Sequence, residues 1–112
     1  MNTGSIEAKT VEAKGIRFAL IENEREIARA YLYIMHNDLH SEPFGLLEDV
    51  YVNENYRGSG LGTKLVKQVI SVAKEQNCYK LIAISRKSRL KVHQLYERLG
   101  FVCRGYEFRI DL

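Results

Sequence analysis

The hydrophobic positions in the first third of the chain fall into two stretches that are typical of β-strands. Residues 16–21 and 27–35 are rich in Ile, Leu, Phe and Tyr, and the polar segment 22–26 separates them. A short polar segment between two such stretches indicates an antiparallel hairpin. We therefore expect a sheet whose first two strands are neighbours.

Two further strand-like runs flank an amphipathic helix. Residues 46–52 form one run, and residues 81–84 form a short apolar run that predicts a strand buried on both faces. The helix between them is expected to end near Asn77, which tolerates the left-handed conformation. Its apolar positions recur at helical spacing: Gly62, Leu65, Val66, Val69, Ile70 and Ala73. This order of strand, helix and strand predicts a right-handed crossover between parallel strands.

The last third of the chain predicts a second helix and a final strand. Residues 92–99 carry an apolar stripe, and Gly100 follows as the expected stop. Residues 101–112 are predicted to form a strand, because Tyr106, Phe108, Ile110 and Leu112 alternate with polar residues, and Gly105 marks a bulge or turn within it. The predicted fold class is therefore α/β (α+β), with a mixed, mostly antiparallel sheet, a central parallel strand pair and two main helices.

Length and composition indicate one globular domain. The chain has 112 residues, of which 46% are hydrophobic and 28% charged. We expect residues 15–112 to form the domain and residues 1–14 to form an arm or a weak first strand through Ile6, Ala8 and Thr10. No apolar run approaches the ~20 residues that span a membrane. The polar N-terminus lacks the apolar centre of a signal peptide, so the expected location is cytoplasmic, without a membrane partner.

Charge and cysteine content exclude some function classes. The net charge is +3, and a basic cluster within it is either a solvated surface or a phosphate-facing patch: Arg86, Lys87, Arg89 and Lys91. Because no aromatic residues interleave with these charges, we expect no nucleic-acid partner. Cys78 and Cys103 are isolated and lack metal-ligand spacing, so we expect buried structural thiols and no metal site.

The most informative segment is a glycine-rich turn that leads directly into the first helix. Arg57 precedes Gly58, Gly60 and Gly62, and such a loop presents unpaired N–H groups at the positive end of a helix dipole. An anionic phosphate is the usual occupant of such a site. The P-loop pattern fails because Thr63 follows the last glycine where Lys is required, and the dinucleotide fingerprint fails because its third glycine is displaced.

The segment LLEDVYVNENYRGSGLGTKLV, residues 46–66, resembles the acyl-CoA-binding segment of the GNAT superfamily of N-acetyltransferases. The signature of that family is Gln/Arg-x-x-Gly-x-Gly/Ala between a strand and a helix. A second block, RLKVHQLYERLGF at residues 89–101, is similar to the later helix of the family, which ends in Tyr-x-x-x-Gly-Phe. The resemblance covers about residues 16–112 and implies that the parallel strands splay apart to admit the cofactor arm.

The resemblance implies that acetyl-CoA is the co-substrate and assigns residues to bind it. The pantetheine arm of coenzyme A would pair with the strand at Val50, Tyr51 and Val52. Backbone amides would cradle the pyrophosphate at Arg57, Gly58, Ser59, Gly60, Leu61, Gly62 and Thr63. Arg89 and His93, at the start of the second helix, complete the expected cofactor-binding set. Arg89 occupies a position where many relatives carry Asn, and His93 either contacts the cofactor or belongs to the core.

The resemblance also implies two catalytic side chains. Glu48 is the expected general base, because relatives place acidic residues here on the acceptor side, and Asp49 is the alternative. Neighbouring strand residues point to opposite faces, so only one of the two should face the acceptor. Either acid would otherwise be a solvated residue or the partner of Arg17 or Arg29. Tyr96 is the expected proton donor to the departing thiolate and otherwise a core tyrosine.

These expectations define a function and an alternative. The function is acetyl transfer from acetyl-CoA to a primary amine on a small molecule or a protein, and the alternative is a non-catalytic acyl-CoA-binding or interaction module. The pair of helices that usually walls the acceptor site is missing between the first two strands. We therefore expect an open acceptor side and a homodimer, with the tyrosine-rich hairpin (Tyr31, Tyr33) and the C-terminal strand as its surfaces.

Overall fold

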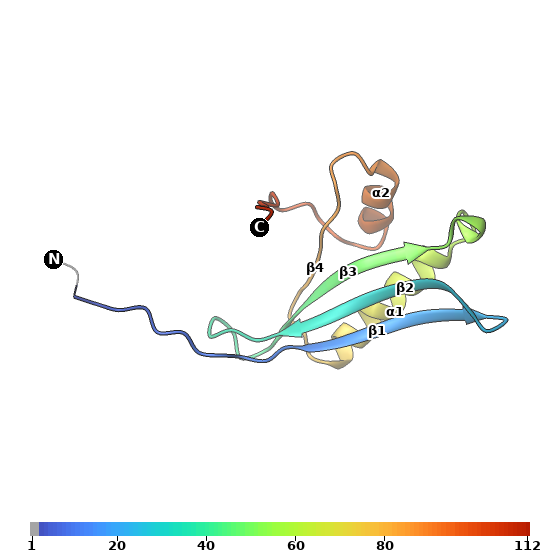
Figure 1. Ribbon diagram of the computed structural model, residues 1–112. Helices are drawn as coiled ribbons and strands as arrows, with labels where there is room; N and C mark the ends of the chain where they lie inside the picture. The colour runs from blue at the N-terminus through green and yellow to red at the C-terminus, as the bar shows by residue number, and fades with distance from the viewer. Residues whose placement is uncertain (1–2) are drawn as a thin grey trace.

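The computed structural model describes residues 3–112 and shows a four-stranded mixed sheet with α1 behind it and α2 beyond its β3–β4 edge (Figure 1). The strand order is β1-β2-β3-β4, and only the β3–β4 pair is parallel. The predicted fold class is therefore confirmed. The elements in chain order are β1 (Lys14–Glu22), β2 (Arg25–Met35), β3 (Phe44–Val52), a 3₁₀ turn η1 (Glu54–Tyr56), α1 (Leu61–Glu75), β4 (Leu81–Ala83) and α2 (Leu90–Arg98).

Strands β1 and β2 form the predicted hairpin, closed by a tight turn. Asn23 and Glu24 both adopt positive φ angles, 50° and 64°, between the paired residues Glu22 and Arg25. Two such residues between antiparallel strands match the right-handed twist of the sheet, which is why this turn class is favoured in hairpins. No helix intervenes between these two strands.

The core lies between one face of the sheet and α1, which runs behind the strands in Figure 1. Alternate residues of β2 point toward the helix and are buried, and the predicted apolar stripe of α1 packs against them. The buried residues of this layer are Ala28, Ala30, Leu32, Ile34, Leu47, Leu65, Val66, Val69 and Ala73. We call the opposite face of the sheet, which α1 leaves uncovered, the outer face.

The crossover from β3 through α1 to β4 ends in a short parallel pairing. Asn77 takes the left-handed conformation at φ 62° after α1, as predicted. Gly45 of β3 pairs with Leu81, and a Cβ at Gly45 would stand 2.9 Å from the Leu81 Cδ1 atom. A glycine is therefore required for β3 and β4 to approach this closely.

The segment after α2 departs from the prediction. Gly100 stops the helix at φ 99°, but residues 101–112 form no strand, so the predicted final strand is wrong for the structure. Phe108 is 93% exposed, and no hydrogen bond joins this segment to β4. An alternating pattern fixes which side chains share a face, but a strand needs a hydrogen-bonded neighbour to persist. Residues 3–13 are likewise exposed and without regular structure, so the weak first strand is also absent.

Two burial predictions also require correction. Ile82 in β4 is 36% exposed, because the outer face has no covering layer there, so β4 is not buried on both faces. Cys103 is exposed in the C-terminal segment, whereas Cys78 is half-buried, and both thiols are free. Only Cys78 fits the expectation of a packed thiol.

Candidate active site

The centre of β3 contains a β-bulge that sequence alone did not reveal. Tyr31 pairs with Glu48 and Arg29 pairs with Tyr51, so β3 places two residues, Asp49 and Val50, opposite a single residue of β2. Asp49 has a φ of 49°, in the left-handed region. A bulge leaves its extra residue outside the ladder and redirects the neighbouring side chains.

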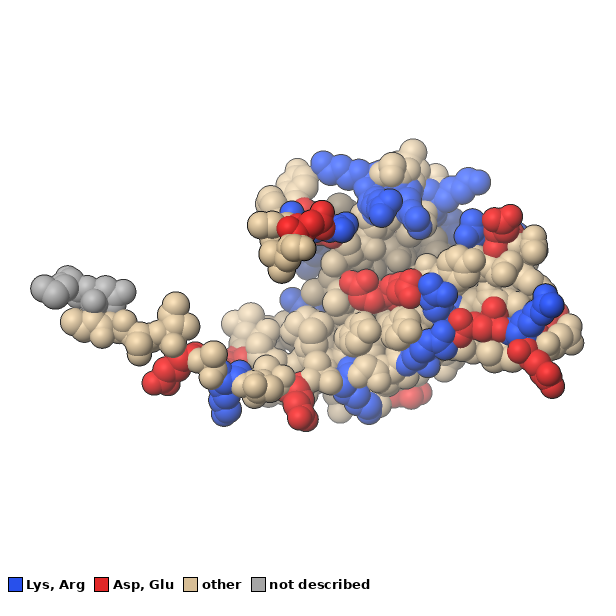
Figure 2. Space-filling view, viewed as in Figure 1, with Lys and Arg blue, Asp and Glu red and all other residues tan. Residues whose placement is uncertain are grey.

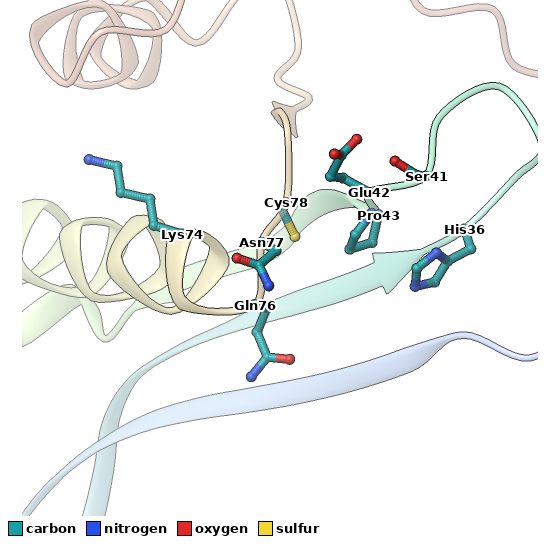
Figure 3. A pocket seen from close by; sticks show the side chains of 8 residues that line it. All are labelled: His36, Ser41, Glu42, Pro43, Lys74, Gln76, Asn77 and Cys78. Atoms are coloured by element: carbon teal, nitrogen blue, oxygen red, sulfur yellow. The ribbon is translucent and has the colours of Figure 1, made fainter.

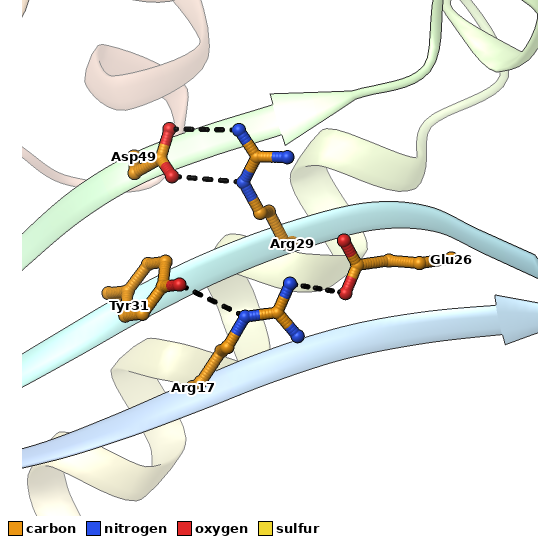
Figure 4. A network of polar contacts seen from close by, with 5 residues as sticks. All are labelled: Arg17, Glu26, Arg29, Tyr31 and Asp49. Carbon is orange, nitrogen blue, oxygen red and sulfur yellow. Dashed lines mark hydrogen bonds and ion pairs between the residues drawn. The ribbon is translucent and has the colours of Figure 1, made fainter.

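The bulge changes which face the two adjacent acids share. Glu48 lies on the outer face, because it stands directly opposite Tyr31, and Asp49 turns to the same face to meet Arg29 (Figure 4). The prediction that only one of them can face a given side is therefore wrong. That prediction requires side chains to alternate regularly between the two faces of the strand, and the left-handed conformation of Asp49 interrupts the alternation.

The two acids differ in their partners. Arg29 donates from Nε to the Asp49 carboxylate at 2.9 Å and from a terminal nitrogen at 3.4 Å. This hydrogen-bonded pair lowers the pKa of Asp49. Glu48 makes no hydrogen bond or ion pair with the described residues. Glu48 is therefore the carboxylate that remains available for proton transfer.

Tyr96, on α2, lies within electrostatic reach of Glu48. Its pKa is raised, mainly because burial disfavours the phenolate and also because the Glu48 carboxylate is near. The ring contacts that of Phe101 at a centroid distance of 5.1 Å, and the Phe101 backbone N–H donates to the Tyr96 carbonyl at 3.0 Å. The structure thus places the two predicted catalytic side chains within electrostatic reach of each other, and both effects favour the neutral phenol.

Strands β3 and β4 part just before Glu48. Their pairing covers only Gly45, Leu46 and Leu47 on β3, and β3 continues to Val52 without a neighbour on that side. The β3 backbone therefore presents N–H and C=O groups that β4 does not satisfy, on the side facing α2. An extended, amide-containing ligand can pair with such an edge as another strand would.

The glycine loop lies at the far end of this exposed strand edge. Gly58 and Gly60 both have a φ of 84°, a conformation that L side chains rarely adopt. Gly60 caps α1 without any side-chain hydrogen bond, and the first backbone bond accepted there comes from Lys64. The amides of Leu61, Gly62 and Thr63 thus lack intrahelical acceptors, so the loop has the chemistry of an anion site.

Hydrogen bonds from its own side chains hold this loop in place. The Arg57 Nε donates to the Val52 carbonyl at 2.8 Å, and the Ser59 hydroxyl donates to the Tyr56 carbonyl at 2.6 Å. A Cβ at Gly62 would lie 3.8 Å from side-chain atoms of both Val52 and Leu95. The first turn of α1 therefore sits between the end of β3 and α2.

His93 and Arg89 occupy the start of α2, where they shape the preceding loop. The His93 Nε2 is 2.8 Å from the Arg86 carbonyl, so this nitrogen carries the proton and donates. Arg89 is the exposed N-cap residue and accepts the backbone N–H of His93 at 3.1 Å. Lys and Arg side chains gather over α2 in Figure 2, on the side toward which the strand edge opens. His93 thus holds the basic loop, a role that its place in the sequence did not indicate.

A separate hollow lies at the opposite end of the sheet and is a poor candidate for the chemistry. It measures about 780 Å³ and is lined by His36, Ser41, Glu42, Pro43, Lys74, Gln76, Asn77 and Cys78 (Figure 3). It contains none of the predicted site residues, and burial raises the pKa of the Cys78 thiol, which keeps it protonated. Among residues 3–112 there is no cluster of three or more His, Cys, Asp or Glu side chains able to hold a metal ion, and no helix fit to cross a membrane.

Comparison with known proteins agrees with this geometry. The model of the acetyltransferase (GNAT) family matches residues 5–101. The chain is 38% identical over 68 residues to glucosamine 6-phosphate N-acetyltransferase of Trypanosoma brucei brucei, covering 61% of this chain and 44% of that protein. It is 38% identical over 97 residues to a probable enzyme of the same name in Drosophila melanogaster, covering 82% and 43%. The chain thus spans less than half the length of these two relatives.

Solved structures give the same result. A putative acetyltransferase from Agrobacterium tumefaciens superposes with a TM-score of 0.81 at 32% identity, over 88% of this chain and 69% of that one. Glucosamine-6-phosphate N-acetyltransferase from Arabidopsis thaliana superposes with a TM-score of 0.78 at 25% identity, over 87% and 66%. With its glycine loop, parted strands and bulge, the chain belongs to the GNAT family of acetyltransferases.

Proposed function

We propose that this protein transfers the acetyl group of acetyl-CoA to a primary amine, with Glu48 as general base and Tyr96 as general acid. The observation that carries the proposal is an unpaired carboxylate within electrostatic reach of a half-buried phenol, near the point where β3 and β4 part. The loop at the end of the same strand edge has the geometry of a diphosphate cradle. Family membership supports the choice of co-substrate.

The loop and the strand edge would bind the two parts of coenzyme A. The pyrophosphate would accept hydrogen bonds from amides of residues 57–63, where left-handed glycines bring bare backbone to the surface. The pantetheine arm would pair with β3 at Val50, Tyr51 and Val52. Arg89 and the neighbouring basic side chains would then face the phosphate end of the ligand.

Glu48 would remove the proton from the acceptor amine. A lysine-like amine with a pKa near 10.4 is mostly protonated at pH 7, and neutralising it costs ~4–5 kcal/mol at about 1.36 kcal/mol per pH unit. A carboxylate without a competing cation can accept this proton directly or through water. Asp49 is less suited to the task, because its hydrogen-bonded pair with Arg29 lowers its pKa and makes it the weaker base.

Val50 and Tyr96 would stabilise the two negative charges that develop during the reaction, one on the thioester oxygen and one on the departing sulfur. The bulge frees backbone N–H groups next to Val50, and one of these would stabilise negative charge on the thioester oxygen. The Tyr96 phenol, whose pKa is raised, would hold its proton at neutral pH and give it to the departing sulfur.

A matched pair of variants tests the assignment. We expect Glu48→Gln to lose most of its turnover at pH 7, while Asp49→Asn, its neighbour on the same face, keeps most of it. The assay would follow release of free coenzyme A thiol with a panel of primary amines. The base would be misassigned if Asp49→Asn lost turnover and Glu48→Gln did not.

The same experiment separates catalysis from the non-catalytic alternative. An acyl-CoA-binding module would bind acetyl-CoA but release no thiol with any amine, so neither substitution would have a turnover to change. Calorimetric titration with coenzyme A, run beside the turnover assay, distinguishes a module from a protein that does not bind the ligand.

A further inference from the structure

The outer face beside Glu48 carries two tyrosine rings. Tyr31 and Tyr33 lie on the same face of β2, with their planes inclined by 5° and their centroids 6.0 Å apart. A Cβ at Gly15 would stand 3.1 Å from the Tyr33 ring, so the ring rests over Gly15 of β1. Tyr33 remains 38% exposed, which leaves ring surface open to a ligand.

This aromatic surface is adjacent to the proposed base. Tyr31 stands directly opposite Glu48, and Tyr33 stands opposite Leu46 in the same row. Diagonal neighbours across an antiparallel pair are ~7–8 Å apart, so Tyr33 lies about that far from Glu48. Ile82 of β4, paired with Leu46 and 36% exposed, extends the apolar surface. A ligand whose amine reaches Glu48 would lay its body over these side chains.

The charges beside the rings argue against an anionic acceptor. Arg17 forms an ion pair with Glu26 and donates from Nε to the Tyr31 hydroxyl at 3.0 Å (Figure 4). Arg29, the other arginine on this face next to Tyr31, is held by Asp49. Both cations are therefore neutralised by carboxylates, and Glu48 remains as an unpaired negative charge. A cation on an apolar body complements this surface better than a phosphorylated sugar.

We propose that the acceptor is an arylalkyl primary amine, whose aromatic ring lies on Tyr33 while its amine reaches Glu48. This inference rests on the proposed acetyl transfer and names the substrate class of that site. Tyr33 sets the preference for a ring through aromatic contact and apolar burial. Arg17 acts as a positioning residue, because its bond to the Tyr31 hydroxyl and its guanidinium 5.7 Å from the ring centroid fix the neighbouring ring.

Kinetics with a matched pair of amines test the proposal. Phenylbutylamine and butylamine share a reacting group and differ by the ring, which phenylbutylamine carries at about the distance of Tyr33 from Glu48. We expect kcat/KM to be about 10-fold higher for phenylbutylamine, the worth of one well-placed aromatic contact. Tyr33→Ala should remove this ratio, and Tyr33→Phe, which keeps the ring, should preserve it. Glucosamine 6-phosphate should be the poorest of the three acceptors.

Tyr79→Ala is the control substitution. Tyr79 is also 38% exposed, but its ring contacts that of His40, in the loop that borders the hollow at the far end of the sheet. An unchanged amine ratio in Tyr33→Ala, or a preference for glucosamine 6-phosphate, would overturn the proposal. So would a dimer in solution that Tyr33→Ala dissociates, because the face would then be an interface between copies.

A binding measurement separates this inference from the proposed function. Phenylbutylamine would be titrated calorimetrically into the protein loaded with coenzyme A. Binding that Tyr33→Ala weakens about 10-fold supports the aromatic site even if no amine is acetylated, in which case only the catalytic proposal fails. Absence of binding in the wild type overturns the inference.

Discussion

Replacing Tyr96 with phenylalanine removes a single hydroxyl group from the proposed site. The ring keeps its contact with Phe101, and the hydroxyl makes no hydrogen bond among the described residues. No buried polar partner is therefore left unsatisfied in the folded protein. We expect the melting temperature and the affinity for coenzyme A to stay close to those of the wild type.

Turnover should respond very differently. Loss of a general acid lowers the rate by about 10²–10⁴-fold, which corresponds to ~2.7–5.4 kcal/mol at about 1.36 kcal/mol per factor of ten. Because the proton moves in the transition state, kcat and kcat/KM should fall together. The raised pKa of Tyr96 means that the phenol stays protonated to a higher pH than a free tyrosine. The wild-type rate should therefore fall only above about pH 10, and the variant should lack this alkaline limb.

The assay is single-turnover release of thiol at saturating acetyl-CoA, so that product release does not limit the rate. Thermal unfolding and coenzyme A titration of the same preparation establish that the variant is folded and binds. A Tyr96→Phe protein that performs the chemical step at the wild-type rate would show that Tyr96 is a packing residue. A large loss of coenzyme A affinity would also contradict the reasoning, because it would place the hydroxyl in ground-state binding.

Four further outcomes are expected. Coenzyme A at about 100 times its Kd should stabilise the fold by ~2.7 kcal/mol and raise the melting temperature by on the order of 10 °C, and an unchanged melting curve would remove the basis for the glycine-loop site. Gly60→Ala should destabilise the protein by ~1–2 kcal/mol through its left-handed φ and weaken coenzyme A binding, whereas Gly105→Ala, at a position with open space and no positive φ, should change neither. The deficit of Glu48→Gln in kcat/KM should shrink as pH rises from 7 toward 10, because more of the amine is then neutral without a base, and a deficit independent of pH would contradict the assigned role. We also propose a homodimer held by the exposed C-terminal segment, and no longer by the hairpin tyrosines Tyr31 and Tyr33, which the proposed acceptor would occupy. Light scattering should show twice 12.9 kDa for the wild type and a monomer after Phe108→Asp with Ile110→Asp.

The sequence predicts those elements of the fold whose apolar side chains recur with a clear helix or strand period. The apolar stripe from Gly62 to Ala73 and the two stretches around the hairpin turn gave the correct elements, because helix and strand differ in period. The final strand at 101–112 was wrong, because alternation reports side-chain faces and carries no information about a hydrogen-bonding neighbour. The wrong burial prediction for Ile82 has a related cause, since an apolar run in the sequence does not show whether a second layer of structure covers that strand.

The glycine loop was predictable because its conformation depends on residues that are close together in the sequence. Gly58 and Gly60 adopt the positive φ that only glycine tolerates well, so their spacing reported the backbone directly. The bulge was not predictable in the same way, because it depends on the register between two strands. The available signal was Asp49 itself, a residue with low strand propensity that enters the left-handed region more readily than most.

The bulge and the parting of the strands act on the same few residues of β3. Without the bulge, Asp49 would turn away from the outer face and could not meet Arg29. With the bulge, Asp49 takes the arginine and Glu48 stays unpaired beside Tyr96. Because β4 leaves β3 at Leu47, the β3 backbone near Val50 also has no neighbouring strand on the side away from β2. A single left-handed residue therefore separates an acid that pairs with an arginine from one that has no partner, at the point where β3 and β4 part.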